Sequence, residues 1–190
     1  MATTDVQIVN MALLALGADT ITALTDTSSK EAIVANALFD QAREEVLMAH
    51  PWACAVKRAN LDMDVPPDYG WDNAFTLPTD FLAVVEVDGV DPGGVQMYEI
   101  EDGRLLTNLD EVNIRYIYRN EDPSSYSPML TECITLNLAS KMAYPIVGKE
   151  SVANVLYQKY ERKLNEARCR DAQASQNSPS GDDYLITERF

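Results

Sequence analysis

Apolar residues at the start of the chain recur at the spacing of an amphipathic helix. In residues 4–16 they fall every three or four positions, which places them on one helical face. Thr3 or Thr4 is suited to cap the first turn, and Gly17 stands where a helix commonly ends in a left-handed conformation. The pattern predicts a first helix over these residues, followed by a polar loop over 18–27.

A second stretch with helical spacing covers residues 28–49. Ser28 and Glu31 are three positions apart, which is the spacing of a capping box, and Pro51 requires the helix to end before it. At 1.5 Å per residue, such a helix is roughly 30 Å long. Its apolar face is predicted to consist of Val34, Ala35, Leu38, Phe39, Ala42, Val46 and Leu47.

Helical spacing returns in the last third of the chain. A third helix is expected over residues 128–147, ending at Gly148, with a kink or an early stop at Pro145. A fourth, which is the longest and the most basic, is expected over residues 151–174. These two helices are expected to pack with the first two as a bundle. The predicted apolar face of the fourth helix consists of Val152, Val155, Leu156, Tyr160, Leu164 and Ala167.

The middle of the chain changes to the period of two that is typical of β-strands. Its apolar segments are rich in β-branched and aromatic residues and are separated by Gly and Asp turns. Asp102-Gly103 predicts a tight hairpin turn. One small antiparallel sheet is expected, with strands at residues 81–88, 95–101, 104–108 and 112–119.

These elements together predict an α+β protein of three parts. Residues 1–61 and 124–174 form a four-helix bundle-like body, and residues 62–123 form an antiparallel β subdomain inserted into it. A chain of 190 residues is long enough for one well-filled core with a small appended subdomain. Residues 175–190 are expected to form an extended, flexible C-terminal arm, because Ser, Gln, Asn, Pro and Gly dominate their first half.

The end of this arm is apolar again. A polar tether with an apolar tip is typical of an arm that docks on a partner, and a frayed terminus is the alternative interpretation. The docking interpretation predicts that the arm is ordered only in an assembly. Its candidate partner-binding residues are Tyr184, Leu185, Ile186 and Phe190.

Negative charge is concentrated in the β subdomain. The chain has 30 acidic and 15 basic residues, a net charge of −15. Residues 62–122 contain 15 acidic and 3 basic residues, a net charge of −12, which leaves −3 for the remainder. Tight binding of nucleic acid requires clustered Lys and Arg, so this distribution argues against it. An acidic wall nevertheless allows DNA to pass without adhering.

Residues that carry chemistry are few. His50 is the only histidine, and it is expected to have a structural role near a helix end rather than to form a dyad with Cys54. Three widely spaced cysteines favour reduced thiols over a zinc site or a disulfide framework. No catalytic, cofactor-binding or metal-binding residue is assigned, and no cofactor is expected. The acidic pairs that fit no EF-hand spacing are Asp62/Asp64, Asp88/Asp91, Glu101/Asp102 and Asp182/Asp183.

The order of these segments resembles the head-to-tail adaptor family of short-tailed phages, called tail tubular protein A, and its prophage relatives. The resemblance covers about residues 5–175. The matching motifs are segments of helix and strand and not catalytic motifs. The resemblance is therefore specific only through the order and spacing of these segments. The motifs are IVNMALLALGADTI, AIVANALFDQAREEVLMAHPWACAVKRANL, LPTDFLAVVEV, YEIEDGRLLTN, VNIRYIYR, LTECITLNLASKMAYPIVG and ANVLYQKYERKLNEARCRDAQ.

The resemblance implies a structural protein of the virion, assembled in the host cytoplasm, with no catalytic residues. Adaptors of this family form twelve-fold rings beneath the portal protein, join the capsid to a tail nozzle or tail tube, and surround the channel through which DNA leaves. In related adaptors the C-terminal segment binds the portal, which implies that role for residues 175–190. No contact with a membrane is expected, because no apolar run approaches the roughly 20 residues of a membrane span.

Two other functions are compatible with the sequence. A soluble oligomeric binding module would use exposed helix faces and need no portal. A metal-dependent hydrolase or nuclease would use the carboxylates of residues 62–122. That activity requires several carboxylates to converge on one site, whereas alternation along strands sends them to opposite faces.

Overall fold

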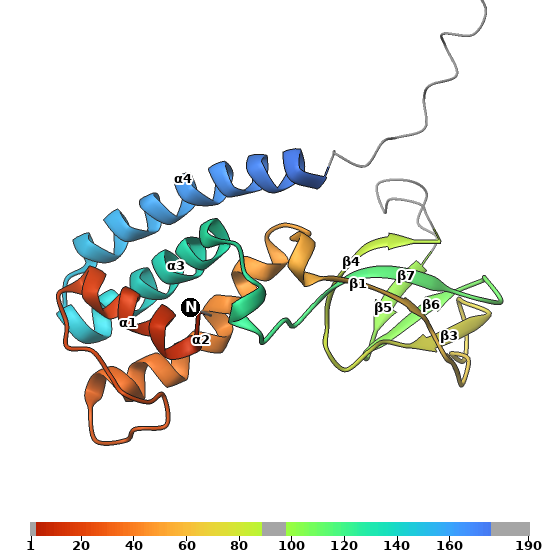
Figure 1. Cartoon of the computed structure of the whole chain (residues 1–190). Helices are drawn as coiled ribbons and strands as arrows, with labels where there is room; N and C mark the ends of the chain where they lie inside the picture. The colour runs from red at the N-terminus through yellow and green to blue at the C-terminus, as the bar shows by residue number, and fades with distance from the viewer. Residues whose placement is uncertain (1–2, 89–97, 176–190) are drawn as a thin grey trace, which may run out of the picture.

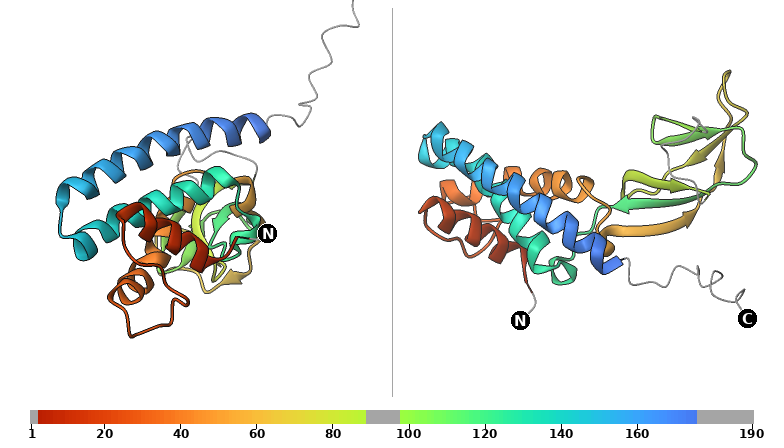
Figure 2. Two further views of the ribbon diagram at one scale, coloured as in Figure 1. Left: turned by 60° about the vertical axis from the view of Figure 1, so that its left-hand side comes forward. Right: turned by 90° about the horizontal axis from the view of Figure 1, so that it is seen from above.

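The computed structural model describes residues 3–88 and 98–175. Figures 1 and 2 show the helices gathered in one body and the strands in a second part at its end. The predicted α+β class is confirmed. The elements are α1 (Asp5–Leu16), α2 (Lys30–Met48), η1 (Ala53–Ala55), β1 (Val56–Asn60), β2 (Met63–Asp64), β3 (Asn73–Thr76), β4 (Phe81–Val87), β5 (Tyr98–Glu101), β6 (Arg104–Thr107), β7 (Asn113–Tyr118), η2 (Pro123–Ser125), α3 (Pro128–Val147) and α4 (Glu150–Ser175).

The ends of α1 and α3 follow from the residues that flank them. Thr4 caps α1 by accepting a hydrogen bond from the Gln7 backbone, and the Gln7 side chain accepts one from the Thr4 N–H. Gly17 and Gly148 end the two helices with φ angles of 71° and 72°, a left-handed conformation that glycine adopts readily. Pro145 does not stop α3 early, since the helix continues to Val147.

The start of α2 differs from the prediction by one residue. Ser29, not Ser28, is the cap, and its Oγ accepts a hydrogen bond from the Ala32 N–H. The Ser28 hydroxyl and N–H both donate to Asp26 Oδ1 instead. Because this local turn engages the hydroxyl of Ser28, the predicted cap, the helix begins one position later.

α3 lies at the centre of the helical body and packs against α1, α2 and α4. One face of α3, with Leu130, Ile134, Leu138 and Met142, is fully buried in this core, and the predicted face of α4 is largely confirmed. Val155 is an exception, because it is 52% exposed. Leu38 of α2 is only partly buried, so the buried face of that helix is centred nearer Phe39. The buried α4 residues are Leu156, Tyr160, Leu164 and Ala167.

The β part contains two antiparallel sheets instead of the single sheet expected. One has the strand order β1-β7-β4, and the other has the order β2-β3-β6-β5. Strands β1, β2 and β3 were not predicted, and β1 begins at Val56, ahead of the predicted start of the subdomain at residue 62. A second core holds the sheets together and consists of Leu61, Phe75, Leu77, Val87, Leu105, Val112, Ile114 and Tyr116.

The predicted hairpin turn is confirmed between β5 and β6. Glu101 pairs with Arg104, which leaves Asp102 and Gly103 as the two turn residues. Their φ angles are 48° and 70°, and a two-residue turn of this kind requires positive φ at both positions. Residues 95–97 of the predicted strand lie outside the described residues.

Strand β7 connects the two cores. Ile114 and Tyr116 point between the sheets, whereas Ile117 on the opposite face belongs to the core of the helical body. Asn113 and Arg115 share that opposite face because they alternate with the inward residues. The face of β7 that contains Asn113, Arg115 and Ile117 is therefore covered by the helical body at one end and open at the other.

Candidate interaction surfaces

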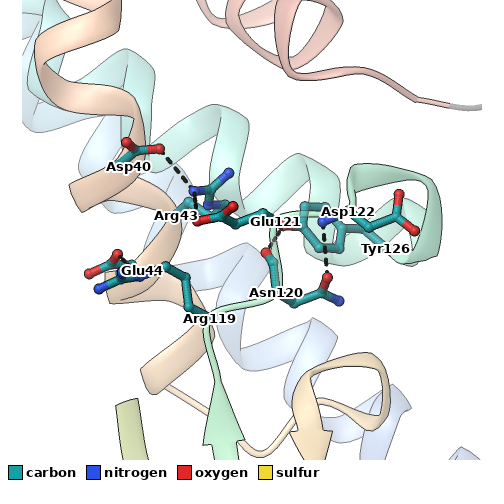
Figure 3. Close-up of polar contacts among 8 residues, drawn as sticks. All are labelled: Asp40, Arg43, Glu44, Arg119, Asn120, Glu121, Asp122 and Tyr126. Carbon is teal, nitrogen blue, oxygen red and sulfur yellow. Dashed lines mark hydrogen bonds and ion pairs between the residues drawn. The ribbon is translucent and has the colours of Figure 1, made fainter. Parts of the chain in front are cut away.

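A buried arginine joins the helical body to the chain that returns from the β part (Figure 3). The Arg43 side chain on α2 is only 4% exposed. Its Nη2 lies 2.9 Å from Asp40 Oδ1 and 3.8 Å from Glu121 Oε1. Its guanidinium also lies 5.3 Å from the centre of the Phe39 ring. A buried charge needs such partners, so Arg43 favours one position of the segment around Glu121.

Further polar contacts hold the same returning segment. Arg119 Nε lies 2.5 Å from Glu44 Oε1 on α2, and Asn120 Nδ2 donates to the Cys54 carbonyl at 2.7 Å. The Tyr126 hydroxyl donates to the Asn120 carbonyl (Figure 3). Residues 119–126 are thus bound to both α2 and η1, which fixes the β part against the helical body.

Replacing Tyr126 with Phe is expected to lower the free energy of unfolding by about 1 kcal/mol. Tyr126 is buried, and burial raises the pKa of its phenol, so the hydroxyl remains a donor. Its loss leaves the Asn120 carbonyl without this partner. Denaturant unfolding measures the effect, and Tyr144→Phe is the control because Tyr144 is 68% exposed. Equal stability of the two variants would show that the Tyr126 hydrogen bond contributes nothing.

Most carboxylates of the acidic segment lie on the surface of the β part. They are distributed over its loops, strand ends and outer faces. This arrangement gives the part a negative exterior. The exposed members are Asp62, Asp68, Asp72, Asp88, Glu99, Glu101, Asp102, Asp110, Glu111, Glu121 and Asp122, while Asp91 lies outside the described residues.

Asp80 is a partly buried member of this segment with two donors. Lys57 Nζ lies 2.7 Å from its Oδ2, and the Tyr116 hydroxyl lies 3.0 Å from its Oδ1. Burial by itself raises the pKa of Asp80, but these hydrogen bonds outweigh it and hold the pKa below the ordinary 3.8. Burial, together with the bond to Asp80, raises the pKa of Tyr116 to about 12.

Asp80→Asn is expected to lower the free energy of unfolding by an amount that depends on pH. Because the folded-state pKa of Asp80 is lowered, its contribution is complete above the unfolded value of 3.8 and disappears as the pH falls through the folded value. The stability difference between wild type and variant should therefore be present at pH 7 and shrink below pH 4. Asp110→Asn is the control, since that carboxyl is exposed. A difference that is constant with pH would contradict an ionic role for Asp80.

The far end of the β part exposes apolar side chains. Val65 is 71% exposed and Tyr69 is 89% exposed, in a loop that contains two consecutive prolines. Next to this loop is a shallow hollow, and Trp71 Nε1 donates there to Glu99 Oε2 at 3.1 Å. Large exposed apolar side chains on a polar rim favour contact with another protein.

His50 contacts a carboxylate, and the thiols of Cys54 and Cys133 have raised pKa values. His50 Nε2 lies 3.1 Å from Asp171 Oδ2 on α4, so its contact ties α4 to the end of α2. Burial raises the pKa of the Cys54 thiol, and burial raises that of Cys133 to about 12. A reactive thiol requires the opposite shift.

Within residues 3–88 and 98–175, no group of three His, Cys, Asp or Glu side chains is placed to hold a metal ion. No helix in that part of the chain is long and apolar enough to cross a membrane. The predicted partner-binding residues Tyr184, Leu185, Ile186 and Phe190 lie outside the described residues. Comparison of the chain with models of known protein families and with curated proteins gives no match.

Proposed function

We propose that this chain is a structural head-to-tail adaptor of a tailed phage. Copies of it form a ring beneath the portal, join the capsid to the tail, and enclose the channel for DNA. The observation that carries the proposal is the order of fold motifs that resembles the tail tubular protein A family. Each motif coincides with one or more of the described elements, from α1 through β4–β7 to α4. In this proposal the helical body is a four-helix bundle, and the protein has no enzymatic activity.

The acidic exterior of the β part supports a position beside DNA or a tail-side partner. Repulsion between like charges prevents adhesion at close range, and salt screens it beyond roughly 8–10 Å. A surface with a net charge of −12 over residues 62–122 therefore allows DNA to slide past it. Part of this segment is proposed to face the channel or the tail nozzle or tail tube.

The portal contact is assigned to residues 175–190. In the related adaptors the C-terminal segment has this role, and here the segment ends in the apolar residues Tyr184, Leu185, Ile186 and Phe190. Several copies in one ring bind together, so a weak contact per copy becomes a firm joint. Exposed side chains at the far end of the β part, such as Tyr69, remain available for a tail-side partner.

Cosedimentation with phage heads tests this function. The chain is expected to sediment with heads that carry the portal and to remain in the supernatant with heads that lack it. Light scattering of the chain, measured with and without purified portal, tests the alternative of a soluble binding module. Such a module would have the same oligomeric mass in both samples. Degradation of DNA by the chain with magnesium or manganese would instead support a nuclease.

A further inference from the structure

The loop between β2 and β3 exposes apolar side chains in the part of the molecule that lies away from the helical body (Figures 1 and 2). Among the large apolar side chains of the described residues, Tyr69 is the most exposed, at 89%, and Val65 follows it. Pro66 and Pro67 have fixed φ angles, and Gly70 has a φ of 92°, which favours glycine. A loop restricted in this way presents its aromatic ring with a small loss of conformational entropy on binding.

A hollow separates this loop from the hairpin formed by β5 and β6. Trp71 lines the hollow from the loop, and Glu99 and Glu101 line it from β5. Trp71 Nε1 donates to Glu99 Oε2 at 3.1 Å, which joins the two walls at one point. Leu106 on β6 forms the floor, because it lines the hollow but is only 3% exposed. The hollow therefore has aromatic and carboxylate walls above an apolar floor.

Carboxylates around the hollow outnumber basic side chains. The lining contains Asp68, Glu99 and Glu101, and its one cation is Arg104. Arg104 Nη2 lies 3.9 Å from Asp102 Oδ2, so a carboxylate outside the lining already opposes its charge. A wider count agrees, because Arg104 is the only basic residue in segments 61–77 and 98–110, which form this sheet and its loops. The surface therefore complements a cationic partner. The acidic residues of these segments are Asp62, Asp64, Asp68, Asp72, Glu99, Glu101, Asp102 and Asp110.

We propose that this hollow, together with the exposed ring of Tyr69, binds an extended, arginine-containing segment of another protein. A guanidinium group combines the two contacts available here, because it pairs with carboxylates through a planar fork of donors and stacks on aromatic rings. Glu99 and Glu101 alternate on β5, so they point to the same side, about 7 Å apart along the strand. Arginines at alternate positions of an extended segment have the same spacing, which favours the pattern Arg-x-Arg.

Binding of such a segment is a property of the free chain and does not depend on the adaptor function. The assignment of the segment to a tail-side partner does rest on that function, because the portal contact is assigned there to residues 175–190. Contacts between exposed charges are weak, so one copy of the hollow binds weakly. The copies of a ring would bind together, which makes the joint firm.

Titration of the full-length chain with the peptide Gly-Arg-Thr-Arg-Gly, blocked at both ends, tests the proposal through tryptophan fluorescence. The chain has two tryptophans, and Trp52 is buried, so a change in emission reports on Trp71. Tyr69→Ala is expected to weaken binding about two- to fivefold, because it removes the ring that stacks on a guanidinium. Glu99→Gln/Glu101→Gln is expected to weaken it about three- to tenfold. The glutamine that replaces Glu99 can still accept the hydrogen bond from Trp71.

Two controls separate this site from a general attraction of cations to an acidic protein. Asp62→Asn/Asp110→Asn removes the same charge from the same part of the chain but outside the lining of the hollow. It should change the affinity by less than about twofold at a salt concentration of about 0.15 M. The peptide Gly-Lys-Thr-Lys-Gly has the same charge but lacks the planar guanidinium groups, and it should bind at least about threefold more weakly.

Equal affinities of the hollow variants and the control pair would overturn the proposal, as would equal affinities for the arginine and lysine peptides. No change in fluorescence at about 5 mM of the arginine peptide would also overturn it. Self-association of the chain that Tyr69→Ala abolishes, measured by light scattering, would overturn it because the occupant would then be a second copy. Peptide binding by a chain that does not attach to phage heads would contradict the adaptor function alone. Attachment without peptide binding would contradict only this inference.

Discussion

Leu156→Asp is expected to lower the free energy of unfolding by about 3–5 kcal/mol. Leu156 lies on the buried face of α4 and is 5% exposed within the core of the helical body. The substitution removes apolar burial, leaves a cavity and places a carboxylate where it has no partner. Denaturant unfolding followed by far-UV circular dichroism measures the loss, provided that the variant remains folded enough to compare.

The neighbouring residue supplies a matched control. Val155 carries the same type of side chain on the same helix but is 52% exposed, so Val155→Asp should change the free energy of unfolding by only about 0.5 kcal/mol or less. If α4 faced the core through its Val155 side, Val155→Asp would be the more destabilising of the two substitutions. Equal stability of the two variants would show that α4 does not pack through the face described above.

Deletion of residues 176–190 is expected to leave the melting temperature nearly unchanged while it abolishes attachment to portal-bearing heads. Residues 3–88 and 98–175 contain two hydrophobic cores, so we expect the fold to persist without the deleted segment. The four apolar tip residues supply roughly 1.5–3 kcal/mol each if they are fully covered by the portal. Cosedimentation with heads measures attachment, and thermal unfolding measures stability.

Two further variants identify which part of the arm binds. Replacing the four tip residues with Ser should abolish attachment as the deletion does, whereas Asp182→Asn/Asp183→Asn keeps the tip and should not. Attachment that survives the deletion would remove the arm from the mechanism. The portal contact would then lie on the helical body, and the exposed basic residues Lys159 and Arg162 of α4 would be the first positions to change.

The helices could be predicted closely because their signals are local. Thr4, Gly17 and Gly148 act on the turn next to them, and each has the predicted role. The prediction that Ser28 caps α2 was wrong because the Ser28 hydroxyl donates a hydrogen bond to Asp26, two residues before it. The buried face of α4 was predicted from spacing alone, apart from Val155, which lies at its edge.

The β part was less predictable because strand pairing is not local. β1 has the sequence VKRAN, whose Lys, Arg and Asn give no apolar alternation, and it becomes a strand by pairing with β7, more than fifty residues away. Alternation in residues 112–119 predicted a strand but not that Ile117 would enter the helical core. The four predicted strands also divide between two sheets, because β4 pairs with β7 in one and β5 pairs with β6 in the other, where the short strands β2 and β3 join them.

The contacts around Arg43 could not be predicted from the sequence either. Its one signal was a charged residue directly beside the apolar face of α2, where Phe39, Ala42 and Val46 are buried. Arg43 is paired in part with Glu121, which the chain brings back only after the whole β part. The arm residues were predicted from composition, and Tyr184, Leu185, Ile186 and Phe190 lie outside the described residues.

Electron cryomicroscopy of portal-bearing heads mixed with the purified chain tests the adaptor function most directly. A closed ring of copies is expected beneath the portal, with a continuous central channel and with carboxylates of residues 62–122 on its lumen or on its tail-side face. Heads that remain unchanged, with no added density below the portal at saturating protein, would contradict the adaptor function. A ring with a basic lumen and with these carboxylates on its outer surface would contradict the role assigned to the acidic segment.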